Sequence, residues 1–235
     1  MKAWACLLML APAIGLTPTV AAAKEPHIAA CKPPEAPDSG ERQRARPLPV
    51  PAALRPVVAS SLYHYAVATL GGGTVCVDTS WMETAESVAL SPDGRFLSFL
   101  WLGYETYGFK LVDRAGRGQV EEIGAAPAFS PSAGLFAAID QTESEFGSLS
   151  GLAVWRVNRV GVTKVAEVPD IPRMQDWRID GWTGESCIAL SALPLVEDER
   201  QAGDTRTERR TRYVARADRG GWQVTAAPRG GCAAR

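Results

Sequence analysis

A unit made of an apolar strand, a tight turn and a second apolar strand recurs along this chain of 235 residues. Its clearest copy lies at 88–101, where Ser-Pro-Asp-Gly separates two apolar runs. Proline presets φ and glycine tolerates a positive φ, so this tetrapeptide is typical of a β-turn. A second Ser-Pro turn at 130–134 follows about 40 residues later, and a third turn lies at 183–186. No segment of helical length carries an apolar stripe with helical spacing, so we expect an all-β fold.

Further short apolar runs complete each unit to four predicted strands. A four-stranded unit that recurs every 40 to 50 residues or so is typical of β-propeller blades, because stacked neighbours bury the faces that one sheet leaves exposed. A predicted hairpin around Gly71–Gly73 precedes the three units. We therefore expect a propeller-like array of about three and a half to four four-stranded blades, with one blade incomplete. The alternatives to a ring closed by one chain are a ring completed by a second copy and an open stack whose edges the N-terminal tail covers.

The chain divides into three predicted parts. Residues 1–23 predict a signal peptide, because Lys2 precedes an apolar run and Ala21–Ala23 supplies small residues before a cleavage point. Residues 24–58 are rich in proline and charge, which predicts an extended tail or linker, and residues 59–235 form the predicted propeller-like domain. No second long apolar run follows, so we expect no membrane span. The chain is predicted to be periplasmic or secreted, from a bacterium of the Gram-negative type.

Four cysteines follow the predicted signal peptide, at Cys31, Cys76, Cys187 and Cys232. An even number of cysteines in an oxidising compartment predicts two disulfides, and their spacing does not fit a zinc site. Three pairings are open. We expect Cys31–Cys232 with Cys76–Cys187, because the first bond would join the two ends of the chain.

A longer motif surrounds the first turn. Residues 88–99 are Val-Ala-Leu-Ser-Pro-Asp-Gly-Arg-Phe-Leu-Ser-Phe, followed by Phe-Lys-Leu-Val-Asp at 109–113 and by Gly116. This order resembles the TolB-like β-propeller repeat. The second unit keeps Phe129-Ser130-Pro131 and Gly134 but lacks the aspartate, and the third keeps only the strand-turn-strand outline. The resemblance implies the fold over residues 86–227, and many unrelated functions use that fold.

No motif for catalysis or cofactor binding is present. The segment Gly147–Gly151 has the glycines of a nucleophile elbow, but Leu149 occupies the position of the serine. Gly71–Gly73 lacks the lysine of a phosphate-binding loop. A formal net charge of −1 gives no electrostatic reason to expect nucleic acid or an anionic membrane as a partner. We expect no catalytic residue, no cofactor and no metal site.

Aromatic and acidic residues gather in two predicted loops that would emerge on the same rim. Aromatic side chains on a rim supply rigid contact area, which favours binding of a partner. We expect a non-enzymatic binding module whose partner is a protein of the cell envelope, or a homo-oligomer if one chain does not close the ring. The alternative is a hydrolase or lyase that acts on an envelope polymer through the four carboxylates of this set. The candidate partner-binding residues are Trp101, Tyr104, Glu105, Tyr107, Asp140, Glu143 and Glu145.

Overall fold

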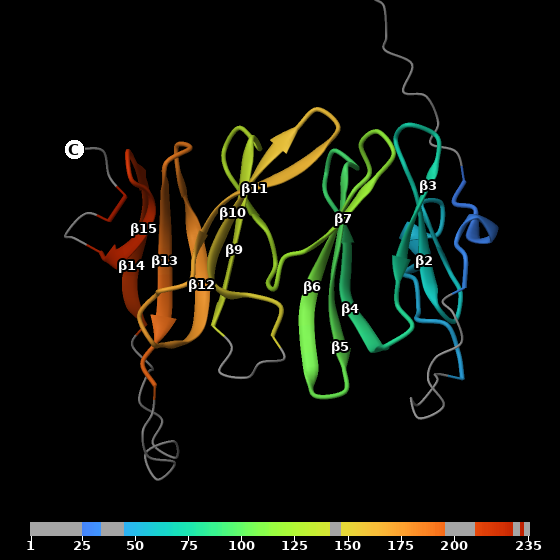
Figure 1. Cartoon of the computed structure of the whole chain (residues 1–235), viewed down its shortest axis with the longest axis horizontal. Coiled ribbons are helices and arrows are strands. Elements are labelled where there is room, and N and C mark those ends of the chain that lie inside the picture. The colour runs from blue at the N-terminus through green and yellow to red at the C-terminus, as the bar shows by residue number, and fades with distance from the viewer. Residues whose placement is uncertain (1–24, 34–44, 142–146, 196–209, 228–230, 233–235) are drawn as a thin grey trace, which may run out of the picture.

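The structure is a computed structural model that describes residues 25–33, 45–141, 147–195, 210–227 and 231–232, and the predicted signal peptide lies outside these ranges. The described residues form strands β1 to β15 in four antiparallel sheets, with two 3-10 helices, η1 (Ile28–Ala30) and η2 (Ala52–Leu54), and no α-helix. The sheets stand side by side in a row, with the first and the last at opposite ends (Figure 1). The predicted all-β fold is confirmed.

Strand order follows the sequence in every sheet. The first sheet contains β1 (Val58–Ser60), β2 (His64–Ala68) and β3 (Thr74–Asp78). The second contains β4 (Met82–Leu90), β5 (Phe96–Gly103), β6 (Thr106–Asp113) and β7 (Gln119–Glu122). The third contains β8 (Ala128–Phe129), β9 (Leu135–Gln141), β10 (Ser150–Asn158) and β11 (Gly161–Val168). The fourth contains β12 (Gln175–Thr183), β13 (Cys187–Leu193), β14 (Thr211–Asp218) and β15 (Gly221–Ala226). The three predicted four-stranded units are confirmed, and the predicted hairpin gains β1 as a third strand.

Apolar side chains fill the space between neighbouring sheets. Alternate residues of a strand point to opposite faces, so Leu97 and Phe99 of β5 pack toward the first sheet whereas Phe96 packs toward the third. Each inner sheet therefore buries both faces and depends on its two neighbours. Representative core residues are Tyr65, Val67 and Val112 between the first two sheets, Phe109, Phe136 and Trp155 between the second and third, and Ile139, Ile188 and Leu190 between the third and fourth.

The Ser-Pro turns are held by their own serines. Ser91 Oγ accepts a hydrogen bond from the first amide of β5 at 2.8 Å, and its carbonyl accepts one from the amide of Gly94 at 2.8 Å. Ser130 repeats both contacts in the turn before β9, at 3.1 and 2.8 Å. Gly94 has a φ of 72°, and Ala133 has a φ of 54° at the equivalent position of the second turn. The left-handed residue of the second turn is thus Ala133, one place before Gly134.

The Arg95 guanidinium joins three segments at the turn end of the second sheet. It pairs with the fully buried carboxylate of Asp113 at the end of β6, with Nε at 2.9 Å and Nη2 at 2.6 Å from the two oxygens. It also donates to the carbonyl of Asn158 in the third sheet at 2.6 Å. The hydrogen bonds with Asp113 raise the pKa of Arg95 despite its partial burial. The arginine and aspartate of the repeat motif therefore link neighbouring sheets.

The proline-rich segment contributes to the core from residue 48 onward. Leu48 and Leu54 are buried among the side chains between the first two sheets. The carbonyl of Leu48 accepts a hydrogen bond from Ser60 Oγ of β1 at 2.8 Å, and that of Pro49 accepts one from the Tyr65 hydroxyl at 2.8 Å. Residues 45–51 therefore run beside β1, and their prolines cannot donate to a ladder. The predicted boundary between residues 58 and 59 falls inside β1. The segment from residue 48 to this boundary packs against the first two sheets, whereas we predicted a tail.

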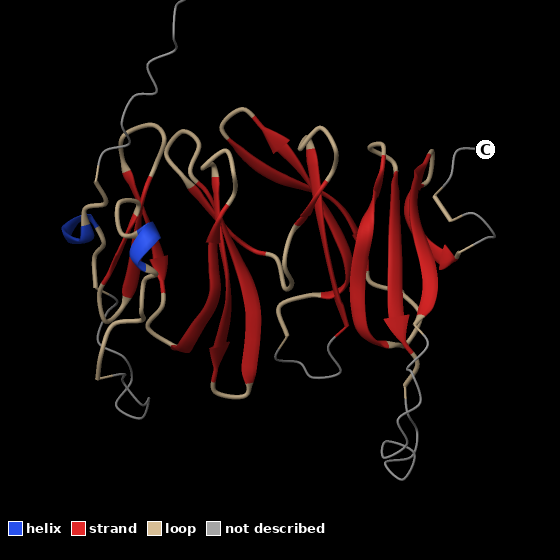
Figure 2. Cartoon of the chain, turned by 180° about the vertical axis from the view of Figure 1, so that it is seen from behind, coloured by secondary structure: helices blue, strands red, loops and turns tan. Residues whose placement is uncertain are grey.

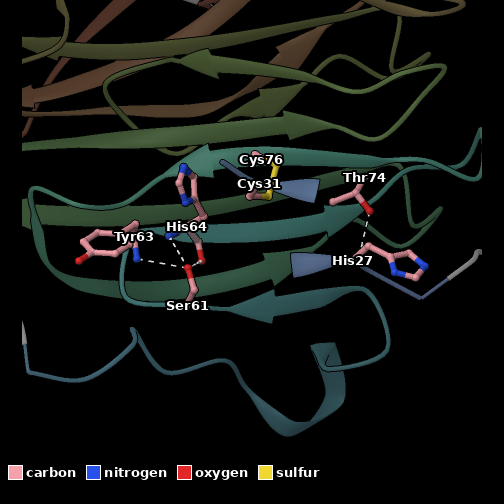
Figure 3. Close-up of a disulfide and its surroundings, with 7 residues drawn as sticks. All are labelled: His27, Cys31, Ser61, Tyr63, His64, Thr74 and Cys76. Atoms are coloured by element: carbon pink, nitrogen blue, oxygen red, sulfur yellow. Dashed lines mark hydrogen bonds between the residues drawn. A yellow bond between two sulfur atoms is a disulfide. The ribbon is translucent and has the colours of Figure 1, made fainter. Parts of the chain in front are cut away.

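Each disulfide joins a terminal segment to the sheet at its own end of the row. Cys31 is bonded to Cys76 of β3, and Cys187 of β13 is bonded to Cys232. Figure 3 shows the first bond between β3 and the segment of η1. Two disulfides are confirmed, but the expected pairing is wrong. The first and last sheets lie at opposite ends of the row (Figure 2), so a bond between the two chain ends would need a closed ring.

The disulfide-bonded segments cover the outward faces of the end sheets. The segment of η1 lies against β2, whose residues are all buried. At the other end Cys232 packs with Val214, which is buried, and Arg216 donates to the carbonyl of Gly231 at 2.7 Å. A sheet end left bare would invite pairing or stacking with other chains. The single chain thus forms an open row with covered ends, as in one of the alternatives to a closed ring.

Candidate functional site

The hairpin between β5 and β6 ends in an exposed aromatic tip. Only Tyr104 and Glu105 separate the two strands, and Glu105 adopts a positive φ of 55°, as a tight turn requires. Tyr104 is 78% exposed. The predicted loop is therefore a two-residue turn on a long hairpin. This hairpin projects from the long side of the row that lies opposite the Ser-Pro turns (Figure 1).

Trp101 lies inside the molecule and does not form part of the surface that we predicted. Its side chain is 3% exposed in the core between the first two sheets. The indole Nε1 donates to both carboxylate oxygens of Glu122, each at 3.1 Å. Its ring packs edge-on against Trp81, with 4.3 Å between ring centroids. Trp101 supports Trp81, which is 40% exposed and was missing from the predicted set.

Lys110 and Glu122 form an ion pair beside the two tryptophans. Lys110 Nζ lies 2.7 Å from a Glu122 oxygen and 5.6 Å from the centroid of the Trp81 ring. The two residues are directly paired across β6 and β7, so their side chains share one face. A Cβ at Gly108 would overlap Ser148 Oγ and would lie 2.6 Å from Glu122 Oε1 and 2.8 Å from Cζ2 of Trp101, so glycine leaves room for the Trp101–Glu122 contact. The base of the hairpin is therefore rigid and its charges are satisfied.

The other face of the hairpin joins the third sheet. Tyr107 is 37% exposed as a residue. Its hydroxyl donates a hydrogen bond to the carboxylate of Asp140 near the end of β9. Burial raises the pKa of Tyr107, and the charge of Asp140 raises it further. Burial also raises the pKa of Asp140, although hydrogen bonds from the Gln141 amide and Tyr107 oppose this. The structure thus brings together two of the predicted residues, from neighbouring sheets.

This aspartate makes stability depend on pH. Because the folded-state pKa of Asp140 is raised above its ordinary 3.8, the unfolded chain ionises first as the pH rises, and stability is lost in that window. The variant Asp140→Asn has no carboxyl group at this position, so its stability does not fall for this reason as the pH rises. We expect its free energy of unfolding to rise relative to the native chain between about pH 3 and about pH 7, measured by urea denaturation. The exposed Asp170→Asn variant controls for the general effect of removing one carboxylate, and an Asp140→Asn difference that is equal at both pH values would contradict the assignment.

Of the remaining predicted residues, the structure describes only Glu105. Glu143 and Glu145 lie outside the described residues. Glu105 is exposed at the turn. Within the described ranges, no group of three or more histidine, cysteine, aspartate or glutamate side chains could hold a metal ion. No helix in the same part of the chain is both long and apolar enough to span a bilayer.

No family model matches the chain, and no curated protein matches it. The site is therefore defined by its own residues. We call Trp81, Tyr104, Glu105 and Tyr107 the hairpin tip.

Sequence reasoning missed the support of the hairpin tip for a specific reason. Trp81, Lys110 and Glu122 lie in three different segments, and only the register of β4 to β7 brings them together. The usable signal was a pair of tryptophans, Trp81 and Trp101, that flank the predicted strand-turn-strand unit, although Trp81 lies several residues before its predicted start. Met82 pairs with Gly103 in this register, so Trp81, the residue before β4, lies beside the end of β5 that carries Trp101.

Proposed function

We propose that this chain is an exported binding module that recognises a protein partner of the cell envelope through the hairpin tip. The observation that carries this proposal is the exposure of three large aromatic side chains around the tip of the β5–β6 hairpin: Tyr104 in the turn, Tyr107 in β6, and Trp81 beside the hairpin just before β4. Tyrosine and tryptophan dominate the energetics of protein interfaces, because they bury much area and lose little side-chain entropy.

The rigid base of the hairpin supports the same function. Trp101, Lys110 and Glu122 fix Trp81 from below, while the Asp140 carboxylate holds the Tyr107 hydroxyl. Trp81 and Tyr107 are thus held in place before a partner arrives. Preorganisation of this kind lowers the entropic cost of association.

The compartment and the fold agree with this proposal. Two disulfides fit an oxidising environment outside the cytosol, which supports a periplasmic or secreted chain. Consecutive antiparallel sheets with Ser-Pro turns support a relation to the TolB-like β-propeller repeat. Membership of that family would account for the fold but would not identify the binding partner, because many unrelated functions use the same fold.

We do not adopt the hydrolase or lyase alternative, because no observation favours it. Acid-base hydrolysis needs two carboxyl groups that face one another across a substrate. Glu105 is exposed at a turn, and Asp140 is engaged by Tyr107 and by its neighbouring backbone amide. Both carboxylates have simpler roles, in the surface of the hairpin tip and in its support.

Site-specific crosslinking tests the proposed function. A photoreactive phenylalanine analogue in place of Tyr104, in the exported chain, should give a discrete adduct with one envelope protein, read out by mass spectrometry. Once that protein is purified, Tyr104→Ala should weaken its binding by more than about tenfold, because a central interface tyrosine contributes about 2 kcal/mol or more.

The matched control places the same analogue at Val165, an exposed apolar residue in the middle of β11. Adducts at Val165 should be absent, and the Tyr104 adduct should vanish when Trp81 and Tyr107 are both replaced by serine. The proposal would be wrong if the two probe positions gave the same adducts or if the Tyr104 probe gave none.

A further inference from the structure

Three turns meet on the long side of the row that lies opposite the hairpin tip. They connect β2 to β3, β6 to β7 and β10 to β11, and Figure 1 shows them adjacent along the upper side. The amide of Leu70 donates to the carbonyl of Arg114 at 2.7 Å. A Cβ at Gly71 would overlap the carbonyl oxygen of Gly116, and one at Gly116 would lie 3.4 Å from Cβ of Val160. Gly71 therefore lets the backbones of the first two turns touch, and the Val160 side chain of the third turn lies next to Gly116.

The side chains on this surface are apolar at the tips and cationic beside them. Val160 is 70% exposed and Leu70 is 52% exposed, although both are aliphatic. Arg117 and Arg159 are exposed next to them, and neither forms an ion pair within the part of the chain that the structure describes. We call Leu70, Gly71, Gly116, Arg117, Arg159 and Val160 the turn patch.

We propose that the turn patch docks this chain on an anionic phospholipid surface. Arginine side chains bind lipid phosphates by charge-assisted hydrogen bonds, and exposed aliphatic side chains at turn tips enter the boundary between headgroups and acyl chains. A soluble anionic polymer would use the two arginines but would leave Leu70 and Val160 in water. The aliphatic tips therefore favour a bilayer as the occupant.

The direction of β6 predicts how the chain would be oriented on a bilayer. The hairpin tip lies at the start of this strand, and the turn patch lies at its end. A chain that docks through the turn patch would point its hairpin tip away from the bilayer, toward other envelope proteins. The near-neutral net charge of the whole chain hides this distribution, because the arginines at one end are offset by acidic residues elsewhere.

Vesicle flotation tests the inference with the mature, disulfide-bonded chain. We expect the chain to float with vesicles of phosphatidylglycerol and phosphatidylcholine, and to stay in solution with phosphatidylcholine alone. Arg117→Gln and Arg159→Gln should each weaken binding by about fivefold at low salt. Val160→Ser and Leu70→Ser should weaken it several-fold at every salt concentration, because that contribution is apolar.

Two matched controls complete the experiment. Arg212→Gln removes an exposed arginine of the last sheet, and Val165→Ser removes an exposed valine of β11, and neither should change flotation. Far-ultraviolet circular dichroism confirms that each variant is folded. The inference would be overturned if the native chain did not float with anionic vesicles, if the controls lost as much binding as the patch variants, or if polyphosphate bound the native chain while vesicles did not.

Discussion

Replacement of Arg95 by methionine is expected to lower the free energy of unfolding by about 3–5 kcal/mol. The substitution leaves the fully buried carboxylate of Asp113 without its cation, with the amide of Ala115 at 2.9 Å as a remaining donor. It also removes the hydrogen bond to the carbonyl of Asn158, which ties the second sheet to the third. Urea denaturation at neutral pH, followed by far-ultraviolet circular dichroism, measures the loss.

An exposed ion pair provides the matched control for this prediction. Lys164 and Glu167 lie 2.8 Å apart with about half of each side chain in water, so Lys164→Met should cost less than about 1 kcal/mol. The double variant Arg95→Met/Asp113→Leu should recover much of the loss, because no unpaired charge stays buried. Equal costs for Arg95→Met and Lys164→Met would contradict a structural role for the repeat motif's arginine.

The strand pattern was predictable from the sequence because local chemistry determines it. The Ser-Pro turns carry their own hydrogen-bond acceptor in Ser91 and Ser130, so the pattern that indicates a turn is also what holds it. Alternation along β5 sends Leu97 and Phe96 to opposite cores, which a period of two residues already implies. The arginine of the motif was visible in the sequence as well, but not its link to the next sheet.

Features that depend on distant segments were not predictable in the same way. The disulfide pairing depends on whether the sheets form a closed ring or an open row. The residues near Cys31 and Cys232 in the sequence do not indicate which of the two arrangements forms. The proline content of residues 24–58 predicted a tail, and nothing in that composition indicated that Leu48 and Leu54 would be buried between the first two sheets. Trp101 was placed on the surface because its strand was predicted too short by two residues, whereas β5 continues to Gly103.

Loss of the C-terminal disulfide should be the second large effect. In the variant Cys187→Ser/Cys232→Ser, a loop of 45 residues is no longer closed in the unfolded chain, which lowers the free energy of unfolding by about 4 kcal/mol in the chain-entropy model. The segment that covers Val214 also loses its covalent bond to the last sheet. We therefore expect a lower midpoint in guanidinium denaturation and faster amide exchange in β14, measured by hydrogen–deuterium exchange.

The N-terminal disulfide is the natural control, because it also closes a segment of 45 residues, at the opposite end of the row. Cys31→Ser/Cys76→Ser should lower the denaturation midpoint by a similar amount, since the chain-entropy contribution is the same. Its faster amide exchange should appear in β2 and β3, while β14 keeps native protection, because stability differs between regions that open separately. If both variants lost protection equally in all four sheets, the disulfides would act only on the unfolded chain, and the two segments would not be separate covers for the ends of an open row.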